Sequence, residues 1–195
     1  MGPAATTPSA RETELLEAAY RYVLEHGLAD LSLRPLATAI GSSPRVLMFL
    51  FGNKDGLVRA LLARARADEL TFLDALTDHP TPPDLAAAVD QVWRWLSAPE
   101  HHPLLRLWTE AYARSLVDPD GPWTGFARTT VDDWLDLLAR FQPPAHRDTP
   151  TARTTRTLAL SVLRGALLDL LATGDEPRAT AAVQHHITTL RGTRG

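Results

Sequence analysis

The chain has 195 residues, of which 45% are hydrophobic, and it carries no cysteine and a formal net charge of −3. This length is enough for one large or two small globular domains. The lack of cysteine excludes disulfides, thiol nucleophiles and thiolate metal sites. No apolar run approaches the roughly 20 residues of a membrane-spanning helix. The polar start of the chain is not a secretory signal, so we expect a cytoplasmic protein.

Charge is distributed unevenly along the chain. Residues 1–66 hold eight basic and six acidic side chains, whereas the remainder holds twelve and seventeen. A net negative charge argues against a protein that coats nucleic acid non-specifically. A slightly basic N-terminal part on an acidic body instead suits a DNA-facing module.

The N-terminal third predicts three helices. Residues 1–9 are rich in Pro, Thr and Ala and predict a flexible tail. Apolar residues at helical spacing then predict a helix from a capping residue, Ser9, to His26, where Gly27 ends it. Ser32 is the expected cap of a second helix that buries Leu36, Ala37 and Ile40.

The stretch from Gly41 to Lys54 predicts a helix–turn–helix. Gly41 allows the positive φ of a sharp turn, and Ser43-Pro44 is a cap followed by the residue best suited to the first helical position. This third helix is expected to run to about Phe51. Gly52-Asn53 repeats the stop-and-cap pattern before the next helix.

Six further helices follow from the same apolar spacing. They are expected from Lys54 towards Asp78, over Asp84–Ser97, near His101–Val117, up to about Phe141, over Arg153–Thr173, and after Pro177. The segment HPTPP at 79–83 is the strongest break between them. No alternating β-branched run predicts a strand. The fold class is therefore all-α, with about nine helices.

The region 11–57 resembles the N-terminal domain of TetR-type transcriptional regulators. The residues that carry the resemblance are Gly27, Ser32, Arg34, Leu36-Ala37, Gly41, Ser43, Leu47, Phe51 and Lys54. The resemblance implies a DNA-binding domain at residues 10–55 and a ligand-binding and dimerisation domain at residues 56–195. One departure concerns Met48-Phe49-Leu50, which replace the aromatic and histidine residues that precede the phenylalanine in the family.

The N-terminal residues of a helix that enters the major groove reach the base edges first. Arg45 is the only long donor on the third helix and can bond guanine O6 and N7; a solvated charge or a phosphate contact is the alternative. Lys54, at a helix start, is expected to contact phosphate. Phe49 could contact bases, but a half-buried role is favoured for it and Met48. The predicted DNA-binding residues are Ser32, Arg34, Ser43, Pro44, Arg45, Val46, Phe49 and Lys54.

The body concentrates aromatic residues, which line cavities in helical bundles but more often fill a core. We expect a ligand pocket lined by Phe72, Trp93, Trp108, Tyr112, Phe126 and Trp134. Trp108 and Tyr112, one turn apart, are the favoured wall. Asp133, Glu110 and Arg106 are candidate polar contacts.

The helix at 153–173 is apolar on more than one face and must therefore be buried on several sides. Either a monomer core or a second copy could provide that burial. We favour a homodimer in which this helix and the last one form a four-helix interface, an arrangement that the resemblance also implies. The predicted interface residues are Leu158, Val162, Leu163, Ala166, Leu167, Leu170, Val183 and Ile187.

Enzymatic and metal chemistry have little support in the sequence. No nucleophile motif or Gly-rich phosphate loop occurs, and no cofactor is expected. The His101-His102 and His185-His186 pairs lack metal-ligand spacing and are interpreted as surface or cap residues. The favoured function is a homodimeric, ligand-responsive transcriptional regulator, most simply a repressor, on a palindromic DNA operator. The alternative is a helical small-molecule binding protein whose helix–turn–helix has lost DNA affinity.

Overall fold

The computed structural model describes residues 9–28, 31–75 and 84–192. Over these ranges it contains nine α-helices, one short 3-10 helix and no strand, which confirms the all-α prediction. The proposed tail at 1–8, the break at 79–83 and the far end of the helix expected to reach Asp78 lie outside the described residues.

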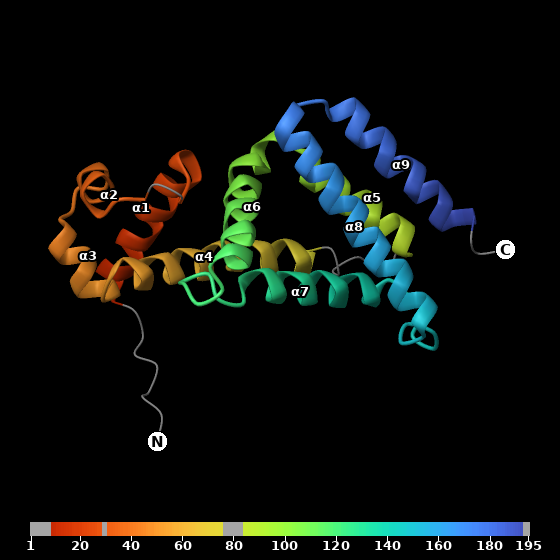
Figure 1. The fold of residues 1–195 in the computed structure, drawn as a ribbon, viewed down its shortest axis with the longest axis horizontal. Coiled ribbons are helices and arrows are strands. Elements are labelled where there is room, and N and C mark those ends of the chain that lie inside the picture. Colours follow the sequence, from red (N-terminus) through yellow and green to blue (C-terminus); the bar gives the residue numbers. More distant parts are fainter. Residues whose placement is uncertain (1–8, 29–30, 76–83, 193–195) are drawn as a thin grey trace, which may run out of the picture.

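A three-helix unit occupies one end of the molecule (Figure 1), and it consists of α1 (Ala10–His26), α2 (Leu33–Ala39) and α3 (Pro44–Phe51). Two of its helices are capped as predicted, because Ser9 Oγ accepts from Glu12 N at 3.1 Å and Ser43 Oγ accepts from Val46 N at 3.3 Å. Ser32 occupies the capping position of α2 but makes no capping hydrogen bond, so that part of the prediction is wrong.

Two glycines shape the turns on either side of α3. Gly41 has a φ of 63°, the left-handed conformation that the sharp turn after α2 requires. Gly56 lies in the first turn of α4 (Lys54–Ala75), where an added Cβ would come within 1.9 Å of the Phe51 carbonyl oxygen. Asn53 caps α4 by accepting from Gly56 N at 2.8 Å. The chain therefore enters α4 at a fixed angle to α3.

The core of the three-helix unit is shared with α4. Leu36 of α2, Leu47 of α3 and Leu57 of α4 are fully buried in this core. Ile40, which was predicted to be buried, and Phe51 are only half-buried. Helix α4 runs without a break through residues 55 and 56, where the sequence predicted the boundary between the two domains. A rotation of the outer part of α4 would therefore carry the three-helix unit with it.

Charged and aromatic side chains fasten α1 to α4. Arg64 bonds Glu17 at 2.6 Å and also pairs with Asp68, while the Tyr20 hydroxyl donates to Asp68 at 2.8 Å. Burial by itself lowers the pKa of Arg64, but the hydrogen bonds to Asp68 and Glu17 outweigh it and raise that pKa above its usual value. Arg64 thus stays charged and joins the two helices.

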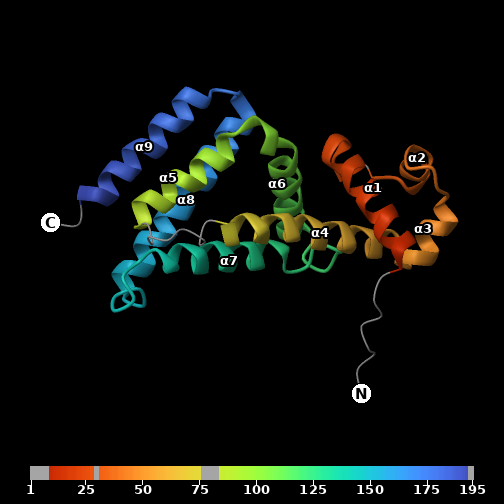
Figure 2. The same ribbon diagram turned by 180° about the vertical axis from the view of Figure 1, so that it is seen from behind.

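The body follows α4 and consists of the remaining helices, α5 (Leu85–Ser97), α6 (His102–Val117), α7 (Phe126–Arg140), α8 (Pro150–Thr173) and α9 (Glu176–Gly192), with a 3-10 helix at Pro99–His101. Helix α7 runs alongside α4, α6 stands across them, and α5, α8 and α9 lie side by side at the far end (Figures 1 and 2). Two side-chain bonds join α9 to α5, namely Trp93 Nε1 to Thr180 Oγ1 and Gln184 Nε2 to Asp90 Oδ1, both at 2.8 Å.

This packing contradicts most of the predicted dimer interface. Five of its residues are buried inside the single chain, where α5, α8 and α9 pack together: Leu163, Ala166, Leu170, Val183 and Ile187. The prediction failed because a helix that is apolar on several sides can satisfy that demand within one chain. Of the others, Leu158 is 54% exposed, and Val162 and Leu167 are half-buried.

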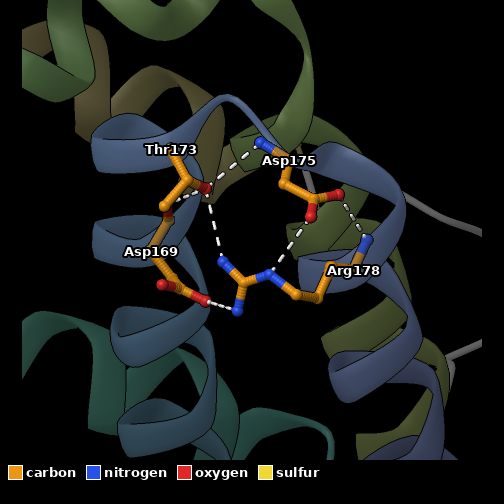
Figure 3. Close-up of polar contacts among 4 residues, drawn as sticks. All are labelled: Asp169, Thr173, Asp175 and Arg178. Atoms are coloured by element: carbon orange, nitrogen blue, oxygen red, sulfur yellow. Dashed lines mark hydrogen bonds and ion pairs between the residues drawn. The ribbon is translucent and has the colours of Figure 1, made fainter.

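The corner between α8 and α9 is held by Arg178 (Figure 3). Its guanidinium bonds Asp169 at 2.5 Å, Asp175 at 3.2 Å and the Thr173 hydroxyl at 3.3 Å. The hydrogen bond from Arg178 lowers the pKa of Asp169 below its usual value. The network fixes the direction in which α9 turns back along α8.

Candidate nucleic-acid interface and body cavity

The outer side of α3 carries the residues predicted to meet DNA. Arg45, Val46 and Phe49 are all exposed and lie within about one turn of one another. Pro44 is half-buried at the start of the helix. In the part of the chain that the structure describes, the Arg45 side chain makes no hydrogen bond or ion pair. Leu47 on the opposite side is buried and anchors the helix. Helix α3 therefore presents a free arginine beside apolar groups.

Phe49 corrects one of the sequence predictions. It is 85% exposed and Met48 is 46% exposed, so the favoured half-buried role is wrong for both. The prediction failed because α3 turns its Leu47 side inward and leaves the Met48-Phe49 side without a neighbouring helix. An aromatic ring held in water on this helix is available for apolar contact with a partner.

Three further predicted residues lie around α3. Lys54 is exposed at the first position of α4, and no described residue pairs with its ammonium group. Ser32 and Arg34 are exposed at the start of α2. Ser43 is also exposed, although its hydroxyl is engaged in capping α3. All eight residues thus occupy surface positions on the three-helix unit or at the start of α4.

A cavity of about 120 Å³ lies in the body between α5, α6, α7 and α8. Four of the six predicted pocket residues line it, namely Trp108, Tyr112, Phe126 and Trp134. The rings of Trp108 and Trp134 meet edge to face with centroids 6.5 Å apart. A second hollow of about 380 Å³, between α4 and the α6–α7 loop, shares Phe126 with it.

The other two predicted pocket residues do not line the cavity. Trp93 is fully buried and its indole nitrogen bonds Thr180, so it belongs to the α5–α9 contact. Phe72 stacks on Trp95 with ring centroids 4.1 Å apart, and Trp95 in turn stacks on His101. These rings fill the core, which was the alternative for every aromatic residue of the body.

None of the three predicted polar contacts lines the cavity. Asp133 pairs with Arg66 at 2.5 Å, which ties α7 to α4. Arg106 is exposed. Glu110 reaches the three-helix unit instead, where its Oε2 accepts from the backbone N–H of Leu28 at 2.9 Å. Glu110 therefore joins α6 to the end of α1.

Arg164 was not among the predicted pocket residues, yet it is the charged side chain that lines the cavity among the described residues. Its guanidinium lies over the Tyr112 ring, 5.2 Å from the ring centroid. Arg164 stands alone among apolar residues in the stretch LALSVLRGALL of α8. A single charge within an apolar helix face was the signal that could have identified it.

Glu69 lies behind the cavity and was also missed. It is 0% exposed, and Trp134 Nε1 donates to its Oε1 at 2.6 Å while its Oε2 has no partner. The net effect of its surroundings raises the pKa of Glu69 to about 7: burial and the charge of Asp133 raise it, whereas the hydrogen bond from Trp134 and the charges of Arg66 and Arg164 lower it. Glu69 therefore exchanges a proton near neutral pH.

The paired histidines depart in part from their interpretation as surface or cap residues: His101 occupies the capping position of α6, although its side chain makes no capping hydrogen bond. His101 stacks on Trp95, and its Nδ1 lies 2.8 Å from the Trp95 carbonyl oxygen. His186 is buried on α9, and burial lowers its pKa. His185 is exposed, as expected. Within the described residues no group of three or more His, Asp or Glu side chains is placed to hold a metal ion.

Comparison with known proteins finds relatives of this arrangement. The profile of bacterial regulatory proteins of the tetR family matches residues 15–61, which span most of α1, the helix–turn–helix and the start of α4. The chain is also 28% identical over 176 residues to the HTH-type transcriptional repressor AcnR of Corynebacterium diphtheriae, covering 87% of this chain and 86% of that protein. The N-terminal part of the chain is thus similar to the tetR-family regulatory proteins, and most of the chain is similar to a transcriptional repressor.

Solved structures share the whole fold. A TetR-family regulator from Cytophaga hutchinsonii superposes with a TM-score of 0.77 at 14% identity, over 97% of this chain and 98% of that one. The multidrug binding protein EbrR, in complex with proflavin, superposes with a TM-score of 0.62 at 24% identity, over 90% and 99%. The likeness in fold thus extends beyond the three-helix unit into the body. No described helix is long and apolar enough to cross a membrane.

Proposed function

We propose that this chain is a cytoplasmic, ligand-responsive repressor of the TetR type that binds a palindromic operator as a homodimer. The observation that carries the proposal is the outward side of α3, where Arg45 is exposed and unpaired on a helix fixed by Leu47. Arg45 would bond a guanine edge, Val46 and Phe49 would contact thymine methyl groups, and Lys54 would bind phosphate. Ser32, Arg34, Ser43 and Pro44 would complete the backbone contacts. The likeness to a repressor supports the sign of regulation.

A second copy would dock on the outer face of α8. The residues Leu158, Ser161, Gly165, Leu168 and Ala172 are all exposed on one stripe of this helix. Their spacing alternates between three and four residues, as in the seam of a helix pair. Leu158 and Leu168 remain 54% and 52% exposed in the single chain, which leaves large apolar side chains to be covered. A two-fold axis at α8 would give the dimer two copies of α3, one for each half-site of a palindrome; such half-sites generally lie about 34 Å apart.

A ligand in the cavity would act on DNA binding through α6. This helix carries Trp108 and Tyr112 in the cavity wall, and Glu110 between them contacts Leu28 of the three-helix unit. A ligand that moves α6 therefore also moves the end of α1, and α4 would carry the rest of the unit along. If the ligand prefers the spacing that does not fit DNA, it shifts the population away from the operator. The proflavin complex of EbrR supports small-molecule binding by a chain of this fold.

Binding to the DNA upstream of the protein's own coding sequence tests the proposal. We expect a sequence-specific shift at sub-micromolar protein that weakens as salt rises, because each phosphate contact releases counterions. The salt dependence should be shallow, since Phe49 and Leu50 cannot bond phosphate. A scrambled duplex of equal length is the control. If no specific, salt-sensitive shift is found, the second function stands instead, a helical small-molecule binding protein; its motivation is the apolar Met48-Phe49-Leu50 run.

The dimer is tested by Leu158→Glu. A carboxylate in the α8 seam would have to be buried without a partner, so we expect the variant to be monomeric and the wild type dimeric in sedimentation at micromolar concentration. Val117→Glu is the matched control, because Val117 is 82% exposed but lies at the end of α6. A monomeric wild type, or a Leu158→Glu chain that stays dimeric, contradicts the α8 interface.

A further inference from the structure

The cavity combines apolar walls with one unpaired cation. Apart from Arg164, no residue that lines it carries a charge, and most are aromatic or aliphatic. Among the described residues, none makes a hydrogen bond or ion pair with the Arg164 side chain. Its Nη2 is buried and has no partner. A buried donor without a partner is costly, so an anion bound in the cavity would satisfy Nη2 of this half-buried guanidinium.

Two more polar atoms in the same lining lack partners. Trp108 Nε1 and Thr130 Oγ1 are both buried and unbonded. An indole N–H and a guanidinium can only donate hydrogen bonds, and a threonine hydroxyl can donate one. Buried polar groups are nearly always satisfied in folded proteins. The unpaired groups around the cavity therefore call for an acceptor rather than a donor.

Glu69 does not supply this acceptor. Its carboxylate lies behind Trp134, outside the cavity lining, and Oε1 is already engaged by the Trp134 indole. The groups that face Glu69 are Trp134 and Asp133 from α7, Arg66 from α4 and Arg164 from α8. Burial lowers the pKa of Arg164, and the charge of Glu69 only partly opposes that effect. The guanidinium is thus left for a group that enters the cavity.

The size of the cavity limits the ligand. At about 120 Å³ it approaches the engineered cavity of about 150 Å³ that accepts benzene. The two indole rings at 6.5 Å provide an edge-to-face surface for one more ring. A single aromatic ring, or an aliphatic group of similar size, would fill this space.

We propose that the cavity binds a small apolar carboxylic acid, with the ring against Trp108 and Trp134 and the carboxylate on the Arg164 guanidinium. The inference rests on the proposed function, in which this cavity is the effector site. An arginine and a carboxylate make two parallel hydrogen bonds, and Trp108 Nε1 is the next available donor. A cationic ligand would leave Arg164 unpaired and is disfavoured.

Calorimetric titration of the full chain with three probes of one size tests the ligand class. The probes are benzoate, benzyl alcohol and benzylammonium. We expect benzoate to bind most tightly. Arg164→Met should weaken benzoate by about tenfold or more, since a charge-assisted pair is lost, and should leave benzyl alcohol within about twofold. Arg164→Lys keeps the positive charge but lacks the planar guanidinium. Its affinity for benzoate should therefore lie between those of the wild type and Arg164→Met.

Arg153→Met on the same helix is the control, because Arg153 is exposed and outside the cavity. It should leave all three affinities unchanged. The inference is overturned if benzoate fails to bind, if benzylammonium binds more tightly than benzoate, or if Arg164→Met weakens benzoate and benzyl alcohol equally. These outcomes leave the operator shift untouched, so a failure of the ligand class and a failure of DNA binding are distinguished.

Discussion

We expect the wild-type chain to lose stability as the pH rises from about 4.5 to 8, because of the buried carboxyl of Glu69. Replacement of Glu69 by glutamine is expected to abolish this loss. The carboxyl has an ordinary pKa of 4.5 in the unfolded chain and about 7 in its buried site between α4 and α7. The unfolded state therefore releases this proton first as the pH rises. The contribution of Glu69 to the free energy of unfolding is therefore largest below pH 4.5 and is lost as the pH rises through 7.

The size of the effect follows from the difference between the two pKa values. Each pKa unit corresponds to about 1.4 kcal/mol, so ionised Glu69 destabilises the fold by about 3 kcal/mol above pH 8. Glutamine cannot ionise, and its carbonyl oxygen can still accept the hydrogen bond from Trp134. The Glu69→Gln chain should thus exceed the wild type by up to about 3 kcal/mol at pH 8 and match it near pH 4.5.

Urea unfolding at a series of pH values measures this difference. Glu100→Gln serves as the control, because Glu100 is exposed in the 3-10 helix and the substitution removes the same charge. Subtracting the unfolding free energy of one variant from that of the other removes the contributions of all groups that the two variants share. Parallel pH profiles for the wild type and Glu69→Gln would show that the buried carboxyl is solvated in solution.

The second large effect is expected at Arg45. If its guanidinium bonds a guanine edge, Arg45→Ala should cost about 1–3 kcal/mol on the preferred operator and remove the preference at one base pair in each half-site. Competition binding with operators that carry each substitution in turn measures this. A uniform loss across all operators would instead assign Arg45 to phosphate.

Lys54→Ala provides the matched comparison, since both side chains are exposed, cationic and unpaired among the described residues. A phosphate contact carries no sequence information. The variant should therefore weaken all operators alike and reduce the salt slope by about one for each subunit. A change of sequence preference in Lys54→Ala would contradict this role. Together the two variants separate base contact from backbone contact on adjacent helices.

The contrast between these residues shows how far local sequence reasoning extended. The caps at Ser9, Ser43 and Asn53 depend on bonds to backbone atoms three residues away, so the sequence was sufficient to predict them. Ser32 shows the limit of this reasoning, because the residue type was right and the bond is absent. The exposed position of Phe49 depended on which helices surround α3, and apolar character alone indicated the wrong side.

The body illustrates the same limit more strongly. Aromatic content and helical spacing predicted a cavity region and placed Trp108 and Tyr112 in its wall. They could not show that Trp93 faces α9, or that Glu110 leaves the body to contact Leu28. Each of these contacts joins residues more than 80 positions apart, and no local pattern carries that information.

The sequence by itself determined the helices, the caps at Ser9, Ser43 and Asn53 and the helix–turn–helix, because these depend on residues within one or two turns of each other. Only the tertiary structure decided which faces of α8 and α9 are buried, since α5 covers Leu163, Val183 and Ile187 and leaves the stripe from Leu158 to Ala172 open. It also brought Arg164 to the cavity and Glu69 behind it. Burial gives both groups their unusual electrostatics, and burial is a property of the assembled helices.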